Sequence, residues 1–107
     1  DVFPDGHAER VQDGFVRARF RKGMDKVVPL VKGQIEQYEI DLWFTSKVFA
    51  PGHRLRVSIT SALFPKYNRN LNTGGNNEKE STFVSAHQRL IHDAAHPSHI
   101  VLPVIPR

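Results

Sequence analysis

The chain has 107 residues, no cysteine, and a formal net charge of +4 that arises from 15 basic and 11 acidic residues. This length suffices for one small domain, residues 1–107, and is too short for a hydrolase domain plus an accessory domain. Without cysteine there is no disulfide framework, and the longest apolar stretches are far shorter than the roughly 20 residues of a membrane-spanning helix. We therefore expect a soluble domain without a membrane partner, and cytoplasmic and secreted locations both stay open.

The first predicted strand covers residues 15–21. Its apolar and basic side chains alternate, and this period of two is typical of a strand with one solvated face. The apolar face holds Val16, Ala18 and Phe20, and the basic face holds Arg17, Arg19 and Arg21. Because these arginines alternate with other residues, and acidic residues occur throughout the chain, we exclude a nucleic-acid interface, which usually has a clustered basic footprint.

A connection over residues 23–33 leads to the second predicted strand, residues 34–44. Its outer face carries Glu39, Asp41 and Trp43, which could complement the arginine face. If the two strands are neighbours, Arg17 or Arg19 lies opposite Glu39 or Asp41, and each such pair contributes roughly 0.2–1 kcal/mol.

Pro51-Gly52 predicts a type II turn, because proline fixes the φ of the first central position and glycine accepts the positive φ of the second. A third strand is predicted after it, over residues 54–61, where Leu55, Val57 and Ile59 share one face. One buried face and one polar face are typical of an antiparallel sheet.

A long polar loop follows, over residues 64–80. Asparagine amides bond to nearby backbone and tolerate left-handed conformations, so we expect the first half of the loop to be ordered and the part from Gly74 to Glu80 to be mobile. Two more strands are predicted, at residues 81–92 and 100–105, the last with Pro103 at an edge or bulge. The chain is thus predicted to be all-β.

Several ordered segments carry a resemblance to a known family. The chain contains DVFPDGHA, DGFVRARFR, YEIDLWFTS, VFAPGHRLRVSITSALFPKYNRNLNTG and HDAAHPSHIVLPV. Together they resemble the C-terminal domain of the cocaine esterase and X-prolyl dipeptidyl-peptidase (acyl esterase) family of serine hydrolases. The resemblance implies an antiparallel jelly-roll β-sandwich, galactose-binding-like, that packs on an α/β-hydrolase catalytic domain and helps to shape its substrate pocket.

The resemblance also implies roles for two segments. One is a contact with the rest of the enzyme, and its residues are Phe64, Pro65, Asn68, Arg69, Asn70, Asn72 and Thr73. The other is a structural turn before the last strand, and its residues are His92, Asp93, His96, Pro97 and Ser98.

The sequence offers no catalytic centre and implies no cofactor. No serine lies in the G-x-S-x-G elbow that exposes a hydrolase nucleophile, so we expect the parent protein to be the serine hydrolase and this chain to be non-catalytic. His92, His96 and His99 are close in sequence, but a zinc site needs three or four converging ligands, and we predict no metal. The alternative function is a free-standing carbohydrate-binding module, with Trp43 and Tyr38 as a sugar platform; packing is the preferred role of these aromatics.

Five predicted strands are fewer than the eight of a jelly roll, so the chain is expected to be the C-terminal part of one. The uncovered apolar faces would then be covered by the rest of the parent polypeptide or, in a homo-oligomer, by a second copy of the chain.

Overall fold

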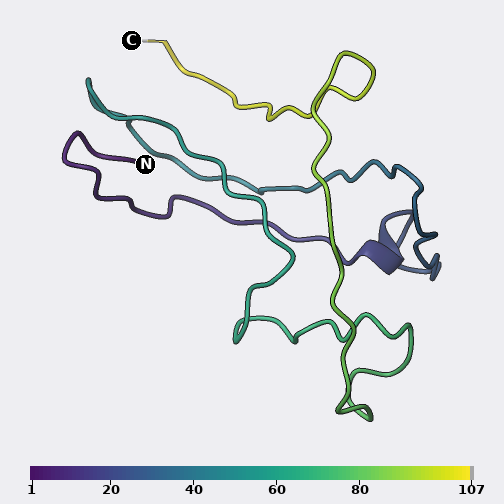
Figure 1. Ribbon diagram of the computed structural model, residues 1–107. Coiled ribbons are helices and arrows are strands. Elements are labelled where there is room, and N and C mark those ends of the chain that lie inside the picture. The colour runs from purple at the N-terminus through teal and green to yellow at the C-terminus, as the bar shows by residue number, and fades with distance from the viewer. Residues whose placement is uncertain (107) are drawn as a thin grey trace. The chain divides into compact units, whose positions relative to one another are not determined.

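The computed structural model describes residues 1–106 and divides the chain into two units, Asp1–Leu63 and the part from Phe64 onward. Within the described residues the one helical element is η1, a 3-10 turn at Ala18–Phe20 (Figure 1). Two isolated antiparallel bridges join Val2 to Ala8 and to Arg54. None of the described helical structure is long and apolar enough to cross a membrane.

The first unit is organised around a clasp formed by residues 1–9 and 53–54, which we name the N-terminal clasp. Val2 exchanges two backbone hydrogen bonds with Arg54, of 2.8 and 2.9 Å. On its other side the chain turns back on itself, and Phe3 N–H donates to the His7 carbonyl over 2.8 Å. Val2 is therefore the central residue of three extended segments, and its side chain is 8% exposed.

Residues 9–21 run antiparallel to residues 36–47, so the segments that carry the arginine face and the acidic face are neighbours. Glu9 contacts Lys47, Gln12 Nε2 donates to the Phe44 carbonyl over 3.2 Å, and Arg21 contacts Glu36. In each pair the two residue numbers add to nearly the same value, which is the signature of an antiparallel register. Figure 1 shows these two segments side by side, the purple one beside the blue one. The ion pairs in this register include Glu9–Lys47 and Arg21–Glu36, and among the described residues none of the predicted pairs between Arg17 or Arg19 and Glu39 or Asp41 is formed.

The turn predicted at Pro51-Gly52 is confirmed. Gly52 has φ of 83°, the value that the second central position of a type II turn requires, and His53 N–H closes the turn onto the Ala50 carbonyl over 3.1 Å. This turn brings the chain back so that Arg54 meets Val2.

The five predicted strands are not present as hydrogen-bonded ladders among residues 1–106. Residues 15–21 contain η1 in place of a continuous strand, because Phe20 and Arg21 donate their N–H groups back to Arg17 and Ala18. In residues 34–44 the alternation breaks at Trp43, whose φ is 59°. The segments 54–61, 81–92 and 100–105 are extended without strand partners, and only Arg54 is bridged. A strand needs a neighbour to satisfy its backbone groups, and the described residues supply few neighbours.

The apolar faces of these segments are correspondingly open. Leu55, Val57 and Ile59, the predicted inward face of residues 54–61, are each more than half exposed. Val2, at 8% exposure, is the one buried apolar residue among the described residues, and none of them is fully buried. The described residues therefore do not confirm the jelly-roll sandwich, which stays a prediction, and the antiparallel direction is present between residues 9–21 and 36–47.

Candidate functional site

The polar loop over residues 64–80 is held by its own side chains. Asn70 and Asn72 bond to each other twice, side chain to side chain over 2.9 Å and through the Asn72 N–H to Asn70 Oδ1 over 3.1 Å. Asn72 has φ of 58°, the left-handed conformation that asparagine tolerates, and its amide reaches the Val84 carbonyl over 2.9 Å. The Leu71 carbonyl accepts the Val84 N–H, so residues 70–72 are fixed against the segment that follows the loop.

The hydrogen bonds extend into the second half of the loop, the part expected to be mobile. Glu80 accepts the Thr73 hydroxyl on one carboxylate oxygen and the Asn76 N–H, over 3.1 Å, on the other. Asn77 bridges the two halves, because its Oδ1 accepts from Leu71 N–H and its Nδ2 donates to the Arg69 carbonyl. The sequence prediction did not include the Glu80 carboxylate as a partner that spans the loop.

Several residues of the loop present side chains at its surface. Phe64, Pro65 and Asn68 are exposed, and Phe64 is joined to Pro65 by a cis peptide bond. The Arg69 guanidinium lies 4.2 Å from the centroid of the Phe83 ring, a cation–π contact. The seven residues predicted to meet the rest of the enzyme thus lie in one self-supported loop, with Phe64, Pro65 and Asn68 at its surface.

The segment from His92 to Ser98 forms a turn closed by one carboxylate. Asp93 Oδ1 accepts the backbone N–H groups of Ala95 and His96, over 2.9 and 2.7 Å, and the His96 imidazole donates to it through Nδ1 over 2.9 Å. These bonds hold the pKa of Asp93 below its ordinary value, mainly through the His96 side chain and then through its N–H. His92 and Pro97 are exposed within the same turn.

This turn does not assemble a catalytic triad. His96 is oriented by Asp93, but the Ser98 hydroxyl donates to the Ile91 carbonyl over 2.6 Å, so the serine is committed to the backbone. A triad requires the serine hydroxyl to bond to the imidazole nitrogen that the aspartate leaves free. Among the described residues no group of three histidine or acidic side chains is placed to hold a metal ion.

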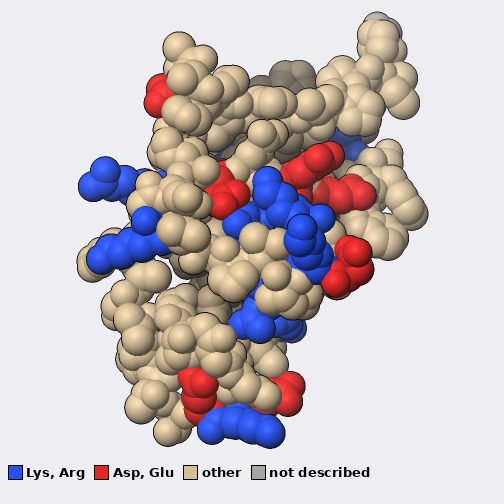
Figure 2. Space-filling model, turned by 90° about the vertical axis from the view of Figure 1, so that its right-hand side faces the viewer, with Lys and Arg blue, Asp and Glu red and all other residues tan. Residues whose placement is uncertain are grey.

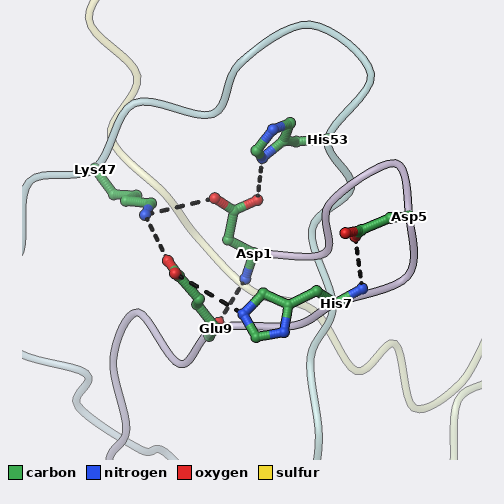
Figure 3. A network of polar contacts seen from close by, with 6 residues as sticks. All are labelled: Asp1, Asp5, His7, Glu9, Lys47 and His53. Atoms are coloured by element: carbon green, nitrogen blue, oxygen red, sulfur yellow. Dashed lines mark hydrogen bonds and ion pairs between the residues drawn. The ribbon is translucent and has the colours of Figure 1, made fainter.

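The sequence analysis missed a polar network in the N-terminal clasp (Figure 3). The Asp1 carboxylate is 1% exposed, accepts a hydrogen bond from His53 Nδ1 over 2.8 Å and forms an ion pair with Lys47 Nζ at 3.5 Å. Lys47 also reaches Glu9, at 3.3 Å, and Glu9 lies 4.0 Å from His7. Asp1 and His53 are 52 positions apart, so no local pattern could have indicated their contact.

The second feature that the sequence did not reveal is the Arg21–Glu36 pair. Arg21 is 3% exposed at its side chain and donates to Glu36 Oε1 over 2.6 Å and to the carbonyls of Ala18 and Val28 over 2.9 and 2.5 Å. The bond to Arg21 lowers the pKa of Glu36 and raises that of Arg21. The guanidinium thereby links η1 to the segment around Val28 and to the segment around Glu36. Its buried Nε has no acceptor among the described residues.

Charges elsewhere are mixed. On the face drawn in Figure 2, basic side chains lie among acidic ones and do not form one continuous basic surface. Each unit, taken by itself, presents exposed apolar residues, and the self-supported loop belongs to the second unit.

Comparison with known proteins connects these features to a family. Residues 1–101 match the model of the X-Pro dipeptidyl-peptidase C-terminal non-catalytic domain. The chain belongs to this family. It is 46% identical to cocaine esterase of a Rhodococcus strain over 109 aligned positions, which cover 100% of this chain and 19% of that protein.

Two mycobacterial relatives, from Mycobacterium bovis and Mycobacterium tuberculosis, are each 35% identical over 79 residues, which cover 58% of this chain and 13% of theirs. Their names provisionally assign both to the serine esterases. The chain therefore spans about a fifth or less of the length of these relatives, and it is similar to the part that does not perform catalysis. No solved structure matches the chain.

Proposed function

We propose that this chain is the accessory domain of a serine hydrolase of the α/β-hydrolase type, an acyl esterase or an X-Pro dipeptidyl-peptidase. In this role it completes a jelly-roll β-sandwich with strands from the rest of the parent polypeptide and packs on the catalytic domain. The observation that carries the proposal is the 46% identity to cocaine esterase over the whole chain, together with the match to a non-catalytic family domain.

The exposed apolar surface supports the same role. Solvent-exposed apolar residues occur along the predicted strands, at positions such as Val57, Phe83 and Leu102. Large exposed apolar areas in a stable protein mark interfaces, and burial of each side chain of this size contributes roughly 1.5–3 kcal/mol. The rest of a hydrolase polypeptide would supply the covering strands at high effective concentration.

The loop over residues 64–80 is suited to line a substrate pocket. Its bonds among Asn70, Asn72 and Glu80 form within the loop, so docking would cost little ordering entropy. Phe64 and Pro65 then provide apolar wall, while Asn68 and Arg69 provide polar contacts at its edge.

The parent chemistry would be acyl transfer. A serine activated by histidine attacks the substrate carbonyl, an acyl-enzyme forms, and water releases the acid. The residues of this chain take no part in bond breaking and act by fixing the shape of the pocket wall.

The test is reconstitution. The remainder of the parent polypeptide is expressed separately, and hydrolysis of nitrophenyl acetate is measured with and without the 107-residue chain. We expect the chain alone to give no saturable turnover, to form a one-to-one complex by sedimentation, and to raise kcat/KM of the remainder. Phe64→Ala in the loop should lower that gain, and Lys79→Ala, an exposed loop residue outside the predicted contact set, should not.

Two results would contradict the proposal. Burst kinetics from the chain alone would place a nucleophile in it, and micromolar binding on a glycan array without any complex with the remainder would favour the carbohydrate-binding module.

A further inference from the structure

The exposed aromatic residues of the first unit include one whose backbone is strained. We propose that Trp43 and Phe44, presented by the segment 41–44, form an anchor that inserts into the apolar surface of the catalytic domain. This inference rests on the proposed function and adds a contact outside the loop over residues 64–80. We name residues 41–44 the aromatic tip.

The aromatic tip is fixed by its neighbours. Asp41 Oδ1 accepts the Trp43 N–H over 2.7 Å, and the Phe44 carbonyl accepts from Gln12 Nε2 over 3.2 Å. Gly14 lies against the backbone of the aromatic tip. A Cβ at residue 14 would collide with the Asp41 carbonyl oxygen and come within 3.1 Å of the Leu42 side chain. The tip is therefore held at both ends and from the side by residues 12–14.

Trp43 adopts a conformation that a tryptophan rarely takes. Its φ of 59° is in the left-handed region, which glycine and asparagine visit at little cost and which is an outlier for a bulky side chain. Such strain persists only where the surroundings impose it, and it is concentrated at sites of recognition and catalysis.

The strained backbone changes what the tip presents. In a regular strand, neighbouring side chains face opposite sides, so one of two adjacent aromatics would be turned inward. Here both aromatic residues are exposed to solvent, Trp43 to 78% and Phe44 to 87%, while Leu42 is half-buried. Two adjacent aromatic side chains at a fixed position are typical of an interface hot spot, where tryptophan is enriched.

The occupant is the catalytic domain of the same polypeptide. About four fifths of cocaine esterase lies outside the part that this chain matches, and the matched part is the non-catalytic one. A surface that large and permanently tethered can bury both rings. A pyranose ligand would also require several free polar groups beside the ring, and one oxygen of the Asp41 carboxylate is already bonded to the Trp43 N–H.

Trp43 is the single tryptophan of the chain, which gives a direct probe. The chain is labelled with 5-fluorotryptophan, and its one fluorine resonance is recorded alone and with the separately expressed, unlabelled remainder of the polypeptide. We expect the resonance to shift on complex formation. Binding of Trp43→Gly, which relieves the strain, is expected to be at least tenfold weaker, although the free energy of unfolding of the variant, measured in urea, is kept or improved. Met24→Ala, at an equally exposed apolar position of the same unit, should bind like the wild type.

Each result decides between alternatives. A complex that forms with an unmoved fluorine resonance and with Trp43→Gly binding like the wild type overturns the anchor and leaves the proposed function intact. If no complex forms, the proposed function and the anchor both fail. A resonance shift that depends on the concentration of the chain alone, or on an added glycan, assigns the tip to a second copy or to a carbohydrate and likewise overturns the proposal.

Discussion

Removal of the Asp1 carboxylate tests the centre of the N-terminal clasp. In Asp1→Ala the His53 imidazole loses its 2.8 Å partner, while Lys47 keeps Glu9. A hydrogen bond to a charged group contributes roughly 1.5–3 kcal/mol, and the Lys47 contact, one third exposed on the lysine side, adds at most about 1 kcal/mol. We therefore expect the clasp to be destabilised by about 2–3 kcal/mol.

The assay is amide hydrogen exchange of Arg54, whose N–H bonds to the Val2 carbonyl over 2.9 Å. Because about 1.4 kcal/mol corresponds to a factor of ten, exchange should be faster by roughly 30- to 150-fold. Asp1→Asn, which keeps the shape and removes the charge, should give an intermediate value.

Asp5→Ala is the matched control, since within residues 1–106 this exposed carboxylate of the same turn accepts only the His7 N–H, over 2.9 Å. Its effect should be confined to His7 and stay below about fivefold. The reasoning is refuted if Asp1→Ala leaves the exchange of Arg54 within threefold of the wild type, or if Asp5→Ala matches it.

Three further predictions concern packing, pH and assembly. Gly14→Ala should cost about 1–3 kcal/mol in urea unfolding because its Cβ meets the backbone carbonyl of Asp41; an unchanged free energy of unfolding would show that residues 14 and 41 are not in contact. The pKa of Glu36 lies below its ordinary 4.5 because Arg21 donates to it, so its contribution to stability is present above that value and is lost as pH falls through the lowered pKa. Exchange protection of residues 18–36 should accordingly fall in acid, and Glu36→Gln should remove this dependence; an unchanged profile in the variant would contradict the assignment. The isolated chain should be oligomeric or poorly folded in sedimentation equilibrium and thermal melts, and a monodisperse monomer with a cooperative melt above about 60 °C would show that it needs no covering strands.

The sequence by itself determined the features that depend on adjacent residues. Pro51-Gly52 specifies its turn because the two residues carry the φ values that the turn requires, and Gly52 has φ of 83°. Asn72 takes the left-handed conformation for a similar local reason, since its neighbour Asn70 supplies the hydrogen bonds. The family motifs are also local strings, and the comparison with known proteins confirms the family they indicate.

The tertiary structure alone decided the contacts between distant positions. The buried Asp1 carboxylate meets His53 only after the chain has returned through the turn, and Arg21 meets Glu36 only through the antiparallel register. Likewise, Gln12 contacts Phe44 and Gly14 lies against Asp41, on either side of Trp43, only because these distant segments are neighbours. Alternation in residues 54–61 predicted a strand with an inward face, but a strand forms only where neighbours satisfy its backbone and cover that face. The sequence alone predicts which face of a segment is apolar. Whether that face is buried depends on the neighbouring segments that pack against it.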